Sequence, residues 1–159
     1  ILVGLVGSEM CIRDSYKGNA PGFENAWLML TAPQLGARHS RRLVGQHRMT
    51  AAETRSGLIL DDEIGVSPSL SPNHPTVSVP YGSLLPQNTH NLLVAGRHIS
   101  TDAQTHTFMR EIPQCWLTGH AAGVAAALTA DRGVEARQVP VTDIRSELAK
   151  QGAYLQASE

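Results

Sequence analysis

The fold expected of this chain is decided by residues Asn91–Ser100, which read NLLVAGRHIS. Leu92–Ala95 is a continuous apolar run, typical of a strand that is covered on both faces in a parallel sheet. The run stops at Gly96, where the missing Cβ lets a ligand approach the main chain. Because ligands of open α/β sheets bind beyond the carboxyl ends of strands, this stretch predicts an α/β domain with a ligand near Gly96.

A long helix is expected after this strand, from about Pro113 to about Asp131, with Gly133 ending it. Proline suits the first turn of a helix, where its missing N–H is no loss. The unpaired N–H groups and partial positive charge of such an N-terminus favour an anionic group. Four small residues at helical spacing lie on one side of this helix, and they could serve ordinary close packing or the approach of a flat ligand. These residues are Gly119, Ala122, Gly123 and Ala126.

The remaining elements are expected from shorter signals. Thr50–Glu53 is a capping box that opens a short helix ending near Gly57. The turn-rich stretch Asp61–Pro75 predicts a surface loop or an insertion. Alternation over Val77–Tyr81 predicts a strand, and Leu43–Val44 predicts another with charged flanks. Phe23–Leu30 is apolar enough for a short helix or a buried run.

The chain is expected to close with a helix whose N-cap is Thr142 and which stops at Gly152. Ile144 and Leu148 would share its apolar face.

The opening segment, ILVGLVGSEMCIRDS, is interpreted as non-native sequence over residues 1–15. Its portion VGSEMCIRDS is similar to a string found at the start of unrelated conceptual translations. Gly4 and Gly7 are spaced G-x-x-G, not as the G-x-G-x-x-G of a dinucleotide-binding loop, and no basic residues precede the apolar run as they would in a signal peptide. The alternative is an ordinary N-terminal strand. The expectation is a truncated reading frame.

Composition excludes several classes of function. A net charge of -1 over 159 residues gives no basic surplus for nucleic acid or anionic lipid. The most apolar segment, Leu117–Ala130, is shorter than the ~18–20 residues of a membrane-spanning helix and is interpreted as a buried helix. Two cysteines without a C-x-x-C motif favour a reducing, cytoplasmic compartment. Seven histidines without an H-E-x-x-H motif predict no metal site.

Two groups of arginines are candidate ligand contacts. Arg97 and Arg110 flank the loop between the expected strand and the long helix. The second group could instead be a solvated strand edge, where positive charge discourages pairing with other chains. It comprises Arg38, Arg41 and Arg42.

Four stretches, taken in order, resemble the carboxyl-terminal part of the FAD-dependent oxidoreductase family with a glutathione-reductase-like nucleotide domain. The similarity covers roughly Leu35–Leu155. The stretches are LGARHSRRLVGQHRMT, VPYGSLLPQNTHNLLVAGRHIS, MREIPQCWLTGHAAGVAAAL and VTDIRSELAKQGAYL. The resemblance implies a partial Rossmann-like α/β domain, FAD as the cofactor and hydride transfer between a small-molecule substrate and the flavin.

The resemblance also implies roles for individual residues. Ala95, Gly96 and Arg97 would line the flavin or ribityl region. Arg110, Ile112 and Pro113 would lie near the ring, and the helix would pack against it through Gly119, Ala122 and Gly123. Arg38, Arg41 and Arg42 become substrate or flavin-edge candidates, whereas no catalytic residue is assigned. His39, Glu111 and His120 depart from the family pattern, which puts the substrate in doubt more than flavin binding.

The expected organisation follows from this resemblance. Residues 16–80 would be a remnant of a substrate or cap region, and residues 81–159 the last part of an FAD-binding domain. The partner would be the missing N-terminal part of the same protein, which would hold the phosphates of FAD. The alternative from another class is a small α/β binding module without catalysis.

Overall fold

The computed structural model describes residues 12–30, 36, 38, 40–67 and 76–155. The chain divides into two compact units, Ile1–His39 and Ser40–Glu159.

In the first unit, residues 12–19 are helical, and turns and irregular chain follow. The rings of Tyr16 and Phe23 pack together with their centroids 5.4 Å apart. The prediction of a helix or buried run at Phe23–Leu30 is wrong. The segment is irregular, and Trp27 and Leu30 are 73% and 80% exposed. Apolar content alone misled the prediction, because the described part of the unit offers no surface that covers these side chains.

The second unit is built around an antiparallel pair, β1 (Glu63–Ser67) and β2 (Val77–Pro80), and every residue of both strands is buried. The strand predicted at Val77–Tyr81 is therefore confirmed. The prediction of a loop over Asp61–Pro75 is wrong at Glu63–Ser67, which forms β1, and residues 68–75 lie outside the described residues. Gly65 explains the error, because it sits in a bulge of the strand and not in a turn. A Cβ there would lie 2.6 Å from Leu117 Cδ1, so this glycine lets the long helix pack closely.

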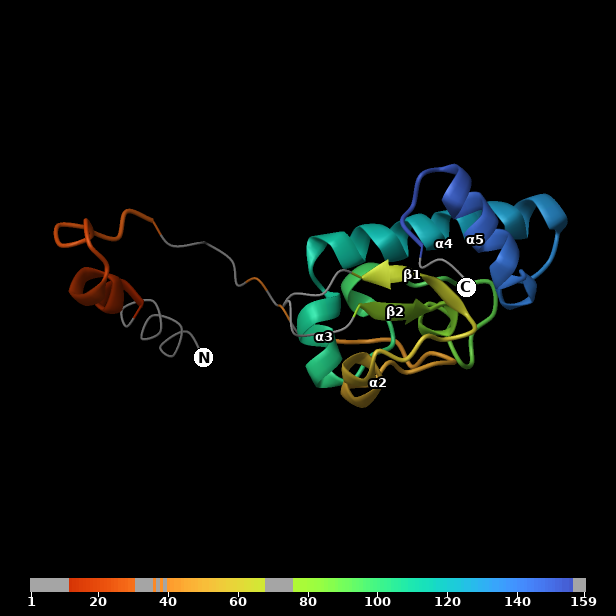
Figure 1. The fold of residues 1–159 in the computed structure, drawn as a ribbon, viewed down its shortest axis with the longest axis horizontal. Coiled ribbons are helices and arrows are strands. Elements are labelled where there is room, and N and C mark those ends of the chain that lie inside the picture. The colour runs from red at the N-terminus through yellow and green to blue at the C-terminus, as the bar shows by residue number, and fades with distance from the viewer. Residues whose placement is uncertain (1–11, 31–35, 37, 39, 68–75, 156–159) are drawn as a thin grey trace. The chain divides into compact units, whose positions relative to one another are not determined.

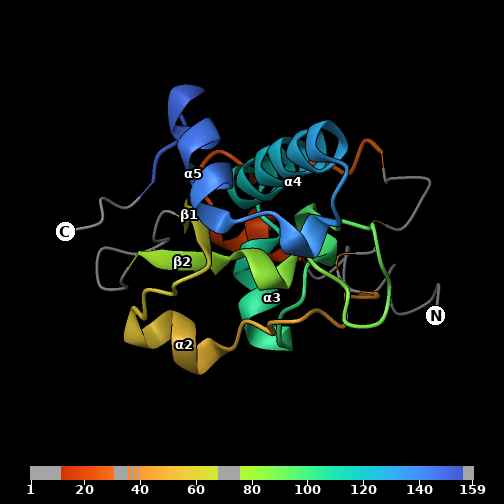
Figure 2. The ribbon, with the colours of Figure 1, turned by 90° about the vertical axis from the view of Figure 1, so that its right-hand side faces the viewer.

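Helices cover both sides of this hairpin (Figures 1 and 2). The long helix α4 (Ile112–Arg132) and α5 (Val141–Lys150) contact β1 and each other on one side. On the other side α2 (Ala51–Ser56) contacts β2 and also α3 (Ala103–Met109). Three short 3₁₀ turns complete the unit: η1 (Tyr81–Ser83), η2 (Gly96–His98) and η3 (Ala136–Gln138).

Most helix ends follow the local signals in the sequence. The capping box of Thr50 and Glu53 is present, and α2 ends at Gly57 in the left-handed region with φ 67°. The long helix is confirmed with proline in its first turn and Gly133 at its end. The prediction that it is buried is wrong for one side, because only the side toward the strands is covered. The last helix is also confirmed, with Ile144 and Leu148 fully buried.

The N-cap predicted for the last helix was wrong, because the helix begins two residues earlier and its N-cap is Pro140. The hydroxyl of Thr142 bonds the side chain of Asp143 and caps no backbone N–H. Helix α3 was not anticipated; its N-cap is Asp102, whose carboxylate accepts from Thr105 N.

The strand predicted at Leu92–Ala95 does not form. The segment is irregular and half-buried, and Leu92 is 46% exposed. Its Val94 N–H donates to Leu84 O at 2.9 Å, but a strand needs a continuous ladder. The strand predicted at Leu43–Val44 is also absent. Val44 is 71% exposed, and the residues that follow it form only isolated β-bridges, Gly45 with Pro86 and Met49 with Thr101.

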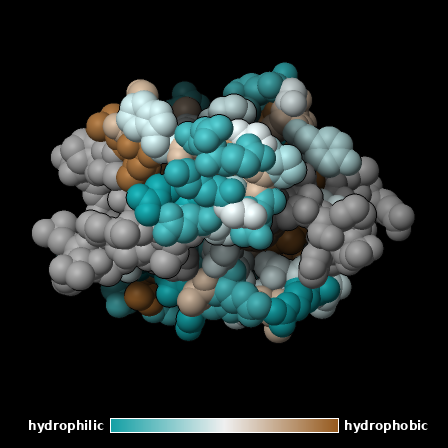
Figure 3. Space-filling view, turned by 90° about the vertical axis from the view of Figure 1, so that its left-hand side faces the viewer, coloured by the Kyte–Doolittle hydropathy of each residue, from teal (hydrophilic) through white to brown (hydrophobic). Residues whose placement is uncertain are grey.

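Within the described residues the architecture is therefore mixed helix with a small two-stranded antiparallel sheet, compatible with part of an α/β domain. No helix in the described part of the chain is long and apolar enough to cross a membrane. On the face drawn in Figure 3, hydrophilic residues predominate among the coloured ones and hydrophobic residues form small separate patches.

Candidate functional site

The corner between η2 and α4 brings together the glycine and the helix start that the sequence singled out. Gly96 has φ +72°, a conformation that favours glycine, and its N–H donates to Thr118 Oγ1 at 3.0 Å. The hydroxyl of Thr118 donates in turn to Gln114 O at 2.8 Å. A Cβ on Gly96 would stand 3.8 Å from Cys115 Sγ. Gly96 is thus held against the first turns of α4, and Ala95 is its half-buried N-terminal neighbour.

Two predicted arginines belong to this corner. Arg97 is exposed, and its carbonyl oxygen lies 2.9 Å from His106 Nε2. Arg110 is partly buried, and its carbonyl oxygen accepts from Cys115 Sγ at 3.4 Å. Burial, helped by the Glu111 carboxylate, raises the pKa of the Cys115 thiol, while Arg97 acts against this rise. Arg97 therefore lies close enough to act on groups at the start of α4.

Three buried polar side-chain atoms of residues near the start of α4 have no hydrogen-bond partner among the described residues. They are Arg110 Nε and both amide atoms, Oε1 and Nε2, of Gln114. The Gln114 residue is only 1% exposed. Because a buried polar group without a partner costs stability, these atoms call for a water or another partner. Sequence reasoning missed Gln114, whose only signal was its place directly after Pro113.

The helix start is open to a ligand. Glu111 is the N-cap, but its carboxylate makes no capping hydrogen bond to the first turn. Ile112 is 63% exposed and Pro113 is exposed. The first N–H groups of α4 therefore keep their capacity to bond an acceptor.

The small-residue side of α4 faces outward. Gly119, Gly123 and Ala126 are exposed and Ala122 is half-buried. A Cβ on Gly119 or Gly123 would meet nothing within 4 Å. The core side of the helix is formed instead by Gln114, Thr118, Ala121, Val124 and Ala125. Ordinary close packing thus does not account for this side, which has room for a further molecule.

The second arginine group is divided between the two units. Arg38 belongs to the first unit, and Arg41 and Arg42 to the second. Arg38 and Arg41 are exposed, whereas Arg42 is partly buried and lines a cleft of ≈ 460 Å³. The cleft is also lined by Ser40, Leu43, Val44, Gly45, Gln46, Arg48, Gln87, Ser100 and Thr101. Sequence reasoning missed these residues because they come from three separate segments.

Asp102 fixes the segment that forms one wall of this cleft. Its carboxylate accepts from Thr105 N at 2.7 Å and from Ala51 N at 2.8 Å, so it joins the starts of α3 and α2. Burial acts to raise the pKa of Asp102, but the hydrogen bonds from these N–H groups outweigh it and lower that pKa. The carboxylate is therefore ionised and structural, beside Thr101.

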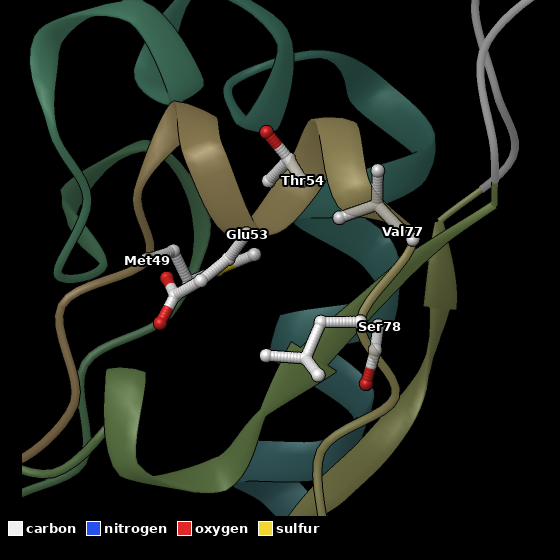
Figure 4. Close-up of a pocket in the computed structure, with 7 residues that line it drawn as sticks. Met49, Glu53, Thr54, Val77 and Ser78 are labelled. Atoms are coloured by element: carbon white, nitrogen blue, oxygen red, sulfur yellow. The ribbon is translucent and has the colours of Figure 1, made fainter.

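A second cavity, between α2 and β2, is too small for a ligand (Figure 4). Its volume of ≈ 10 Å³ holds at most one water. Glu53 on its wall is committed to the capping box, where it accepts from Thr50 N at 2.8 Å. No group of three or more metal-ligating side chains occurs in the described ranges.

Comparison with known proteins gives one family. The family model described as FAD dependent oxidoreductase matches residues 11–69 and 69–148. Searches of the curated proteins and of the solved structures found no match.

Proposed function

Because this chain belongs to the FAD-dependent oxidoreductase family, we propose that it forms the carboxyl-terminal part of a flavoprotein and completes its flavin site at the η2–α4 corner. FAD is the cofactor that family membership implies. The residues that would border the flavin are Ala95, Gly96, Arg97, Arg110, Ile112, Pro113, Gly119, Ala122 and Gly123.

The observation that carries this proposal is that Gly96, with φ +72°, is held against the open N-terminal part of α4. A flavin ring presents carbonyl oxygens and ring nitrogens along one edge, and these can accept hydrogen bonds from main-chain N–H groups or a guanidinium. The uncapped N-terminus of α4 offers further donors and a partial positive charge. The residues present therefore fit a large planar group with a polar edge.

When bound, FAD supplies the capacity to exchange a hydride with an organic substrate. The chain's own part is to bind and to orient. Gly96 lets a planar group approach the main chain, and the exposed glycines of α4 leave room beside the helix. Arg97 and the start of α4 favour negative charge at this corner. Trp116, which is 74% exposed, would exclude water from one side of the occupied site.

The phosphates of FAD would be held by another part of the protein, of Rossmann-like fold. The 159 residues contain no G-x-G-x-x-G sequence. We therefore expect this chain alone to bind FAD weakly and the product of the full reading frame to bind it firmly. The small-molecule substrate would approach from the side of Arg41 and Arg42.

The test is to purify the product of the full reading frame and to measure its visible flavin absorbance. Gly119→Leu and Gly123→Leu should each weaken flavin binding by about tenfold or more, because the new side chains fill the open side of α4. Both positions have free space around a Cβ, so the helix itself should tolerate the change. The matched control is Ala127→Leu, at an exposed position further along the same helix.

A colourless protein that takes up no FAD would contradict the proposal. So would a flavoprotein in which the two glycine variants bind FAD as tightly as the Ala127→Leu control.

A further inference from the structure

We propose that the cleft beside Gly45 binds an oxyanion, carboxylate or phosphate, of a small organic substrate, and that Arg42, Arg48 and Thr101 hold it. The description of the ligand as a substrate rests on the proposed function. The assignment of an oxyanion site does not, because it follows from the cleft itself.

The cleft has the size and charge of a site for a small anion. Its ≈ 460 Å³ lies within the range of about 300–1,000 Å³ that small-molecule sites occupy. Two arginines line it, and no carboxylate is among its lining residues. The remaining polar lining can supply neutral hydrogen bonds, and it consists of Ser40, Gln46, Gln87, Ser100 and Thr101.

Two buried donors of the cleft lack a partner among the residues that the structure describes. Thr101 is only 3% exposed, and its hydroxyl makes no hydrogen bond. The Nη1 atom of Arg42 is likewise buried and unpaired. Donors left in this state cost stability, and a charged acceptor between them removes that cost. A guanidinium binds two oxygens of a carboxylate or phosphate in a planar, bidentate geometry. Arg42 would bind the oxyanion in this way.

The walls of the cleft are held in place before any ligand arrives. Gln87 N donates to Val44 O at 3.0 Å, and Met49 N donates to Ser100 O at 3.1 Å. Gly45 is wedged between these walls, since a Cβ there would lie 2.6 Å from Ser100 Cβ and 3.0 Å from Gly82 O. Binding in such a site costs little ordering of the chain, which favours affinity.

A further hydrogen bond connects the cleft to the proposed flavin corner. Leu43 N donates to His98 O at 2.8 Å, and His98 is the last residue of η2, the turn that begins with Gly96. A molecule in the cleft is therefore bound by a segment that is fixed to the flavin-bordering turn. This connection favours a substrate as the source of the oxyanion.

The test uses the isotope-labelled 159-residue protein and two flavin-free probes, inorganic phosphate and succinate. Amide chemical shifts should change in a saturable way at Gly45, Gln87 and Thr101, with a dissociation constant on the order of 1 mM. Arg42→Met and Arg48→Met should each raise that constant by about tenfold or more. Arg48 is exposed, so its variant should fold even if the Arg42 variant does not. The matched control is Arg55→Met, which removes one exposed positive charge from α2 outside the cleft.

Saturation by phosphate, by succinate or by both confirms the oxyanion site, and the tighter probe identifies the group. Shifts that do not saturate, or that Arg48→Met and Arg55→Met change equally, would overturn it. The probes contain no flavin, so the outcome is separate from that of the flavin experiment. If the 159-residue protein binds the probes but the product of the full reading frame takes up no FAD, the oxyanion site stands and the flavoprotein proposal fails. If the full product takes up FAD but the probes do not bind, the flavoprotein proposal stands and the oxyanion site fails.

Discussion

Arg145 on α5 binds Glu63 on β1 through one nitrogen atom: its Nη1 lies 2.9 Å from the main-chain oxygen and 3.0 Å from Oε1 of Glu63. Glu63 is 1% exposed and stands 82 positions earlier in the chain. The pair thus fixes the last helix to the first strand. A charge buried this deeply depends on its partner, because water cannot replace it.

Arg145→Met should therefore lower the free energy of unfolding by about 3 kcal/mol, since it leaves the Glu63 carboxylate buried without that partner. Urea unfolding measures the change. The comparison is Arg132→Met, which breaks an exposed ion pair with Asp143 and should cost about 1 kcal/mol or less. Equal losses of unfolding free energy in the two variants would show that the buried pair stabilises the protein no more than the exposed pair does.

Tyr81→Phe should make stability less sensitive to alkali. Burial raises the pKa of the Tyr81 phenol to about 12 from its ordinary 10.0, and its hydroxyl donates to Ala136 O at 2.9 Å. A raised pKa gives stability that is full below pH 10.0 and is lost as the pH rises toward about 12. The variant should lose about 1 kcal/mol at neutral pH and show a shallower alkaline decline.

Unfolding curves measured from neutral to alkaline pH check this prediction. Tyr154→Phe, at an 80% exposed position, is the matched control and should change neither quantity. An alkaline decline that is the same in Tyr81→Phe and in the natural protein would contradict the role of the buried phenol.

Asp102→Ala should destabilise the protein by about 2 kcal/mol, because one carboxylate serves the first turns of two helices. The pKa of Asp102 is lowered from its ordinary 3.8, so its contribution is full above that pH and is lost as the pH falls further. The difference from the natural protein should therefore shrink only in strong acid. Asp61→Ala, at an exposed position, is the comparison, and a pH-independent difference would contradict the assignment.

Cys115 should react slowly with thiol reagents near neutral pH. Burial first, and then the Glu111 carboxylate, raise the pKa of this thiol from its ordinary 9.0, so little of the reactive thiolate is present. In a Cys11→Ser background, Glu111→Gln should increase the rate of alkylation several-fold, whereas Glu147→Gln on α5 should not. Alkylation as fast as that of a small free thiol would contradict this prediction.

Short-range signals predicted the helices well. Thr50 and Glu53 form their capping box within four residues, and Gly57 and Gly133 end helices through their own backbone freedom. The information for such features lies within one or two turns of chain. There are two exceptions among the labelled helices. The last helix has its N-cap at Pro140, although the neighbouring Thr142 looked like the better capping residue by type, and helix α3 was not predicted.

Features that depend on distant partners were predicted poorly. Leu92–Ala95 has the composition of a strand, but a strand also needs neighbours along its length, and composition does not supply them. Gly65 looked like a turn residue, although its role is to admit Leu117 of α4. The cleft was missed for the same reason, because Arg42, Gln87 and Thr101 meet only in three dimensions.

Gly45 also fixes the spacing of the residues in the segment that lines the cleft. It is the only glycine between Arg42 and Met49. Any other residue type at this position would place its Cβ 2.6 Å from Ser100 Cβ, which is too close. An insertion or deletion of one residue in this segment could not be absorbed by sliding the chain, since a residue with a side chain would then be forced into the wedge. Homologous chains that keep the cleft should therefore vary in side chains around this glycine but not in the spacing that places one arginine before it and one after.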